Sequence, residues 1–187
     1  IRYIVKSSGS EKGMRADGPS EIMRMHFHVE NAVRDSGIRW AISRPNFFTS
    51  NLMSMAEPVA NMGKLITALP PETTISMIHP ADIGECVSEL LINEDRAGRE
   101  YFLTGPAVTM GDVASTMSRV LGKEVEYVQV TPDVARQAMV EKGEYIVRAQ
   151  DIVLLLGDAL EPKKGSQELA SNLRRLYMYC LLYTSDA

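Results

Sequence analysis

Short runs of β-branched and aromatic residues alternate along this chain with longer stretches in which apolar residues recur every three or four positions. The first pattern is typical of strands and the second of amphipathic helices. The predicted strands are residues 1–5, 38–43, 64–69, 74–78, 100–103 and 125–130. Because neighbouring parallel strands need a crossover helix, the alternation favours an α/β fold with a parallel sheet. The later strands are shorter and less regular, which favours a small accessory lobe.

Composition and charge narrow the classes of protein. The chain has 187 residues, 45% of them hydrophobic, and a formal net charge of −4. This composition is typical of a globular domain, and the acidic balance gives no reason to expect a nucleic-acid partner. No run approaches the ~18 apolar residues of a membrane span, so no membrane association is expected. The two cysteines, Cys86 and Cys180, lie far apart, which predicts reduced thiols and a cytoplasmic location.

Capping residues set the predicted helix boundaries. Ser20 is expected to begin a helix that Gly37 ends, and Pro80 and Thr109 are expected to begin two more. Pro58 is expected to interrupt a methionine-rich helical stretch over residues 49–62. The apolar faces expected for the three capped helices are Ile22, Met25, His26, Val29 and Val33; Ile83, Cys86, Val87, Leu90 and Leu91; and Val113, Met117, Val120 and Leu121.

The C-terminal region lacks this organisation. A last helix is predicted through residues 146–156, and residues 1–156 are interpreted as one domain with an interwoven lobe. Residues 157–187 form a divergent tail that is polar and poorly patterned at first. An abrupt apolar run at 177–183 leaves two interpretations open. The tail is either non-native from about residue 177, a translated scar, or it is a terminal strand or helix that docks on the core.

His26 is the best candidate for acid–base chemistry. His26 and Glu30 are four residues apart on a predicted helix, so their side chains are neighbours. A neighbouring carboxylate can fix the tautomer of an imidazole and raise its pKa. The alternative is a pair on the helix surface beside the core. His28 points roughly 200° away from His26, so the two cannot share a metal ion, and no metal site is predicted.

Polar and aromatic residues directly follow two of the predicted strands. Ser7 and Ser8 follow the first strand, and residues 44–48 (Arg-Pro-Asn-Phe-Phe) follow the second. Ligands of parallel α/β sheets bind beyond the carboxyl ends of strands, so these are the best-placed site candidates. The two phenylalanines are equally compatible with core packing. The glycines of the loop at 7–19 lack the G-x-G-x-x-G spacing, so no phosphate site is predicted there.

A series of short motifs follows the chain in a specific order. It comprises His26-x-x-x-Glu30, Asp35-Ser36-Gly37, Ser43-Arg44-Pro45-Asn46-Phe47-Phe48 with Asn51, His79-Pro80-Ala81-Asp82-Ile83-Gly84, and Glu100-Tyr101-Phe102-Leu103-Thr104-Gly105-Pro106. Each motif alone is unspecific, but their combination resembles the NmrA-like group of atypical short-chain dehydrogenases/reductases. That group includes NAD(P)H-dependent quinone reductases and NAD(P)-sensing regulators. The resemblance covers roughly residues 1–156.

The resemblance implies a Rossmann-type NAD(P)-binding domain with a small substrate lobe. In the family, a glycine-rich phosphate loop follows the first strand of the sheet. Residues 1–5 match the fifth strand instead, and the chain begins without an initiator methionine. The chain is therefore interpreted as the C-terminal part of such a domain, N-terminally truncated and lacking that loop. The implied cofactor is NAD(P)H, with no basis for choosing between NAD and NADP.

The resemblance also implies roles for individual residues. Ser7 and Ser8 line the ribose–nicotinamide side, and His26 faces the acceptor as the catalytic residue. The residues that bracket the nicotinamide are Pro45, Asn46 and Phe47, and those that shape the acceptor pocket are Phe48, Asn51 and Met55. Conventional short-chain dehydrogenases use a Tyr-x-x-x-Lys pair, and the matching positions of this chain are His26 and Glu30. A carboxylate cannot replace that lysine, so a tyrosine-driven carbonyl reduction is not expected.

Three functions stay open at this stage. The first is an NAD(P)H-dependent oxidoreductase that passes a hydride to a quinone-like or other small, apolar acceptor. The second is a non-catalytic NAD(P)-binding redox sensor that signals through a regulatory protein partner, which the missing Tyr–Lys pair favours. The third is an inactive fragment, because an isolated half-sheet exposes strand edges. Either of the first two is compatible with a homodimer.

Overall fold

The computed structural model describes residues 1–9 and 14–141. The helix expected through residues 146–156 and the tail at 157–187 lie outside the described residues. The elements are, in chain order, β1 (Tyr3–Ser7), α1 (Glu21–Asp35), β2 (Arg39–Pro45), β3 (Phe47–Phe48), η1 (Thr49–Met55), α2 (Ala56–Met62), β4 (Lys64–Thr67), β5 (Thr74–Ile78), α3 (Pro80–Ile92), η2 (Glu94–Arg96), β6 (Arg99–Leu103), β7 (Ala107–Thr109), α4 (Met110–Leu121), β8 (Glu126–Gln129) and α5 (Pro132–Glu141). The predicted alternation of strands and helices is confirmed over this range.

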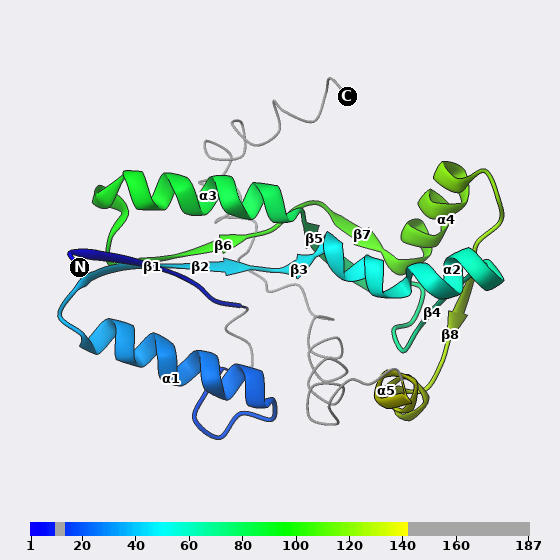
Figure 1. Cartoon of the computed structure of the whole chain (residues 1–187), viewed down its shortest axis with the longest axis horizontal. Coiled ribbons are helices and arrows are strands. Elements are labelled where there is room, and N and C mark those ends of the chain that lie inside the picture. Colours follow the sequence, from blue (N-terminus) through cyan, green and yellow to red (C-terminus); the bar gives the residue numbers. More distant parts are fainter. Residues whose placement is uncertain (10–13, 142–187) are drawn as a thin grey trace.

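Three parallel strands form the main sheet, in the order β1-β2-β6. Helix α1 covers one face of this sheet and helix α3 covers the other (Figure 1). In the register, Val5 of β1 lies opposite Ala41 of β2, and Ser43 of β2 lies opposite Tyr101 of β6. The central strand is buried on both faces, as parallel sheets require. The predicted α/β class is therefore confirmed.

A second hydrophobic core lies beyond the carboxyl end of β2. Strands β3, β5 and β7 form one small sheet there, and β4 and β8 form another. The buried residues of this core are Val59, Leu65, Leu69, Ile75, Met77, Met110, Val113, Ala114 and Val125. Phe47 packs against this core, whereas Phe48 packs against the core beneath α3. Two neighbouring residues of β3 thus pack against different cores.

The predicted caps explain where two helices begin and one ends. Ser20 accepts a hydrogen bond from the Met23 amide at 3.3 Å, and this fixes the start of α1. Gly37 follows the end of α1 with a φ of 71°, a conformation that glycine adopts without steric cost. Thr109 and Asp112 form a capping box at the start of α4, with each side chain bound to the other residue's amide.

The predicted buried face of α1 is wrong in part. Met25 and Val29 are 61% and 49% exposed, while the fully buried residues of α1 are Met23 and Glu30. The remaining members of the predicted face, Ile22, His26 and Val33, are half-buried. The helix is rotated because the sheet surface beneath it presents a buried arginine, Arg44, which needs a carboxylate partner.

Two other local predictions are also wrong. Pro58 does not interrupt the helical stretch, because it occupies the first turn of α2, where amides have no acceptor within the helix. The chain instead changes from a 3₁₀-helix to an α-helix after Met55. Leu91, Val120 and Leu121 are more than half exposed. Leu91 follows the buried Leu90 in the last turn of α3 and lies on the solvent side of that turn, and Val120 and Leu121 are the last two residues of α4.

Candidate active site

The carboxyl ends of β1 and β2 lie at the same edge of the main sheet. The Ser8 amide continues the β1 ladder by donating to the Ser43 carbonyl at 2.8 Å. The Asn46 amide donates to the Leu103 carbonyl at 2.9 Å, which ties the end of β2 to the end of β6. The residues that sequence reasoning placed after two separate strands therefore meet at one edge, where ligands of such sheets bind.

A closed ring of four alternating charges fills the space between α1 and the sheet below this edge. Arg44 holds Glu30 through two hydrogen bonds of 2.9 and 2.7 Å, and its Nε donates to Glu100 at 2.7 Å. Arg34 closes the ring with bonds of 2.8 Å to Glu30 and 2.5 Å to Glu100. The side chains of Arg44 and Glu30 are only 3% and 2% exposed. Buried charges of this kind need such complete pairing.

The ring keeps its members ionised. Burial raises the pKa of a carboxyl, but hydrogen bonds from Ser8 and Arg44 outweigh this effect and lower the pKa of Glu30. Burial also raises the pKa of Glu100, but hydrogen bonds from Arg44 and Arg34 outweigh burial, so the net shift of this pKa is downward. The pKa of Arg44 is raised by its bonds to both carboxylates, against burial. The ring is thus a fixed charged unit that sets the position of α1.

His26 lies at the border of the ring, half-buried on α1. Its Nδ1 is 2.9 Å from the Lys6 ammonium nitrogen and 3.4 Å from the Ser8 hydroxyl oxygen. The oxygens of Glu30 instead accept hydrogen bonds from Ser8, Arg34 and Arg44. The predicted pair on α1 therefore differs from expectation: the polar groups that approach the imidazole Nδ1 belong to Lys6 of β1 and to Ser8, which follows that strand.

The surroundings of His26 favour the neutral imidazole. Burial lowers its pKa, and the positive charges of Lys6 and Arg44 lower it further, whereas Glu30 raises it. The net shift of the His26 pKa is downward. The raised pKa expected from a neighbouring carboxylate is therefore wrong, because burial and the charges of Lys6 and Arg44 outweigh the effect of Glu30.

The structure places the predicted cofactor-binding residues in different environments. Ser7 and Asn46 are exposed at the edge of the sheet, and the Asn46 side-chain oxygen accepts a hydrogen bond from the Phe47 amide at 2.9 Å. Ser8 and Pro45 are buried. The Ser8 hydroxyl donates to Glu30, so it supports the ring from within. Of the five residues, Ser7 and Asn46 present polar groups to solvent.

The predicted acceptor-binding residues lie on β3 and η1, next to the two cores. Met55 packs against the second core, and Phe48 packs against the core beneath α3. Phe47, the fifth of the predicted cofactor-binding residues, also packs against the second core. All three are half-buried, so part of each side chain remains accessible. Asn51 is exposed on η1, and its carbonyl accepts a hydrogen bond from the Ser54 hydroxyl at 2.7 Å. Core packing is thus an observed role for the aromatic residues.

Sequence reasoning missed the parts that Lys6, Arg34, Arg44 and Glu100 play. Strand periodicity contains a signal for two of them. Lys6 of β1 and Arg44 of β2 lie on the same face of the main sheet, the face that packs against α1. The two strands are otherwise largely apolar. A charged residue in a buried strand indicates that an opposite charge lies nearby. The identity of that partner depends on how the helix docks.

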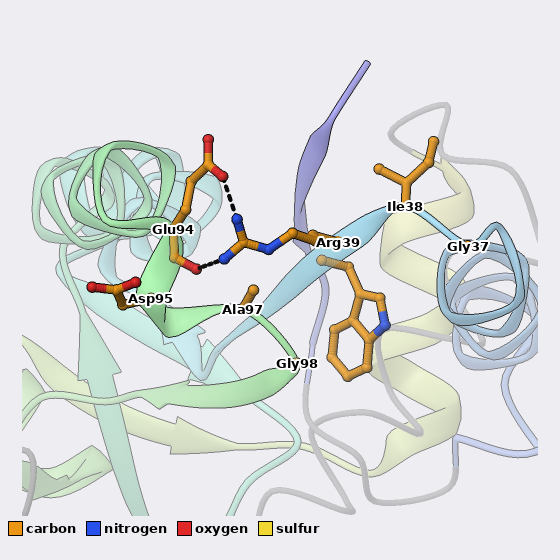
Figure 2. A pocket seen from close by; sticks show the side chains of 8 residues that line it. Gly37, Ile38, Arg39, Glu94, Asp95, Ala97 and Gly98 are labelled. Atoms are coloured by element: carbon orange, nitrogen blue, oxygen red, sulfur yellow. Dashed lines mark hydrogen bonds and ion pairs between the residues drawn. The ribbon is translucent and has the colours of Figure 1, made fainter.

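A shallow hollow of about 470 Å³ lies at the other end of the main sheet. Its lining residues are Gly37, Ile38, Arg39, Trp40, Glu94, Asp95, Ala97 and Gly98. Figure 2 shows the Arg39 guanidinium bound to the side chain and carbonyl of Glu94 beside it. The hollow adjoins the amino ends of β2 and β6, so it is separate from the cluster around His26.

A model of the NmrA-like family matches residues 13–184 of the chain. The chain belongs to the NmrA-like family. The resemblance inferred from the motif order is thereby confirmed. In the described residues of this NmrA-like chain, no helix is long and apolar enough to cross a membrane.

The chain is similar in sequence to two curated relatives and in fold to a solved structure. The chain is 32% identical over 143 residues to (4-alkanoyl-5-oxo-2,5-dihydrofuran-3-yl)methyl phosphate reductase of Streptomyces griseus, covering 76% of this chain and 50% of that protein. It is 31% identical over 144 residues to the NAD(P)H azoreductase of Xenophilus azovorans, covering 76% and 49%. The fold resembles that of an Escherichia coli NADPH-dependent quinone oxidoreductase complexed with NADPH, with a TM-score of 0.74, 19% identity, and coverage of 95% and 66%. The chain therefore spans about half the length of these curated relatives.

Proposed function

We propose that this NmrA-like chain provides the acceptor side of an NAD(P)H-dependent oxidoreductase that reduces a small, flat, apolar acceptor such as a quinone. The observation that carries the proposal is the position of His26. The His26 imidazole is held at the carboxyl edge of the sheet by a hydrogen bond with Lys6, and it lies 3.4 Å from the Ser8 hydroxyl oxygen. The names of the relatives support the reaction class, because both curated relatives are reductases and one is named for NAD(P)H.

The groups exposed at this edge fit the nicotinamide end of the cofactor. Ser7 and the side-chain amide of Asn46 are neutral groups that can hydrogen-bond to a carboxamide and to ribose hydroxyls. Pro45, Phe47 and the Ser8 backbone frame the same edge, and we propose them as its walls. When bound, the reduced nicotinamide supplies a hydride. The residues of this chain hold and orient the ring and its acceptor.

His26 is proposed to face the acceptor. Two roles are open to a histidine there: donating a proton, or orienting the acceptor through a hydrogen bond. The lowered pKa of His26 favours the second role, because the imidazole is neutral at neutral pH. The exposed parts of Phe48 and Met55, with Asn51, are proposed to form the pocket for the acceptor's flat apolar surface.

The test compares His26→Ala with His28→Ala in the natural full-length protein. His28 lies two residues away and is exposed, so its removal controls for changes to α1. We expect wild type and His28→Ala to oxidise NADPH continuously with a panel of quinones and azo dyes. His26→Ala should lose turnover by about 100-fold, as expected for a group that acts on the reacting atoms, with NADPH affinity nearly unchanged.

Two results would contradict the proposal. Unchanged turnover in His26→Ala would remove His26 from the mechanism. Tight NADPH binding without oxidation of the cofactor by any acceptor would favour the alternative of a redox sensor with a regulatory protein partner.

A further inference from the structure

We propose that Lys6 is a positioning residue that holds His26 in the tautomer with its proton on Nε2, so that a neutral N–H donor faces the acceptor. This inference rests on the proposed function for the identity of the acceptor, but the tautomer itself is a property of the resting protein.

The geometry around Lys6 sets the direction of the hydrogen bond. The Lys6 ammonium nitrogen lies 2.9 Å from His26 Nδ1 and 3.0 Å from the Ser7 carbonyl oxygen. An ammonium group has three donors and no acceptor, so it donates in both contacts. A proton on Nδ1 would point at those N–H groups and would be repelled. His26 Nδ1 is therefore the acceptor, and the imidazole proton resides on Nε2.

The other polar groups near His26 are already committed elsewhere. The Ser8 hydroxyl oxygen is 3.4 Å from Nδ1, but its proton is donated to Glu30. Both Glu30 oxygens accept hydrogen bonds from arginines of the ring. A carboxylate beside Nδ1 would accept a hydrogen bond from Nδ1–H and would favour the other tautomer. The ring prevents this arrangement, because the arginines occupy both oxygens of Glu30. Lys6 on β1 thus decides the tautomer of a histidine on α1.

The charged groups that face His26 come from three elements. They are Lys6 of β1, Glu30 of α1 itself and Arg44 of β2. Burial and the two cations lower the His26 pKa, and Glu30 opposes them. Lys6 therefore has a second effect, since its charge disfavours the imidazolium. Its own pKa is lowered by burial and by Arg44, with Glu30 acting in the other direction.

A neutral imidazole with a fixed Nε2–H can bind a carbonyl oxygen of a quinone-like acceptor. Such a hydrogen bond draws electron density from the carbonyl, and it strengthens as negative charge develops on the oxygen. Lys6 would then act on the reaction indirectly, through the orientation of a histidine side chain. The lysine comes from strand β1, and the histidine that it positions comes from helix α1.

The experiment uses nitrogen-15 NMR of the imidazoles in the purified full-length protein without nicotinamide, with His26→Ala to assign the signals. In wild type we expect an unprotonated Nδ1 and a protonated Nε2 at His26. In Lys6→Met, which keeps an apolar stem but removes the donor, we expect a mixture of tautomers and a higher His26 pKa. Lys6→Arg should restore the wild-type pattern, because a guanidinium also donates.

Turnover provides an independent second reading. We expect Lys6→Met to lower kcat by about tenfold with little change in KM, and to move the acid limb of the kcat profile to higher pH. A wild-type spectrum with the proton on His26 Nδ1 would overturn the inference without any variant, even if Lys6→Met failed to fold. An unchanged His26 tautomer and pKa in folded Lys6→Met would also overturn it. If the protein reduced no acceptor, the proposed function would fail, while the spectra would still decide the role of Lys6.

Discussion

The two faces of the main sheet are packed by opposite chemistry. On the α3 face, the contacts are apolar and involve Ile78, Ile83, Cys86 and Leu103. On the α1 face, a ring of two arginines and two glutamates lies between helix and sheet, and His26 and Lys6 adjoin it. In the sequences of both helices, apolar residues recur every three or four positions. Nevertheless, α3 is held by apolar burial and α1 by directed ion pairs.

This contrast explains how the candidate site is positioned. Apolar contacts are non-directional, so they define the rotation of α3 less strictly than aligned hydrogen bonds would. Paired charges in a buried ring hold only when donors and acceptors are aligned. The ring therefore fixes the rotation of α1, and with it the place of His26 at the edge of the sheet.

Removing one charge from the ring should cost the most. Glu30→Ala leaves the buried Arg44 with only Glu100 of its two carboxylate partners, and breaking a buried pair in this way costs about 3–5 kcal/mol. Denaturant unfolding of the variant measures the loss. The control is the double variant Glu30→Leu, Arg44→Met, which removes the buried pair but leaves Arg34 and Glu100 paired. The double variant should be more stable than Glu30→Ala, and the reverse order would show that unpaired charge is not the cause.

On the apolar face, truncation should cost less. Leu90 on α3 is 2% exposed, and Leu90→Ala should lower the free energy of unfolding by about 2–4 kcal/mol through lost burial and a cavity. Leu91→Ala is the matched control, because the neighbouring side chain is 52% exposed and its loss should cost below about 0.5 kcal/mol. Raising the salt concentration should not reduce either effect. Equal losses in the two variants would contradict the observed burial of Leu90 and exposure of Leu91.

Acid should destabilise the protein through the α1 face. The pKa values of Glu30 and Glu100 are lowered in the fold, so their contribution is present above about pH 4.3 and is lost as pH falls through the folded pKa values. The lowered pKa of His26 adds a smaller loss that begins below about pH 6.5. Thermal unfolding across this pH range measures both. A midpoint that rises on acidification would contradict the assignment, and the Glu30→Leu, Arg44→Met double variant should show a shallower acid slope.

The smallest effect should come from an exposed ion pair. Arg39 and Glu94 are bound at 2.5 Å, but their side chains are 52% and 45% exposed. Exposed pairs of this kind contribute about 0–1 kcal/mol, so Arg39→Ala should change stability by less than about 1 kcal/mol. The same measurement on Glu30→Ala supplies the contrast, since the chemistry is alike and burial differs. A large loss in Arg39→Ala would show that burial does not explain the difference.

The amino-acid sequence by itself determined the local elements and their order. Ser20, Gly37 and the Thr109–Asp112 box define helix ends through contacts made within a few residues. The motif order indicated the family, and the strand ends pointed to Ser7, Ser8 and residues 44–48 as one edge. Such features are readable because each depends on neighbouring residues or on a fixed period.

Only the tertiary structure decided which face of α1 is buried and which groups contact His26. The apolar stripe of α1 predicted Met25 and Val29 to be buried, but pairing of Glu30 with Arg44 rotated the helix away from that stripe. Lys6 is 20 residues from His26, and Glu100 is 56 residues from Arg44. No local pattern records these partners, because a buried charge is satisfied by whichever opposite charge the docked elements place beside it.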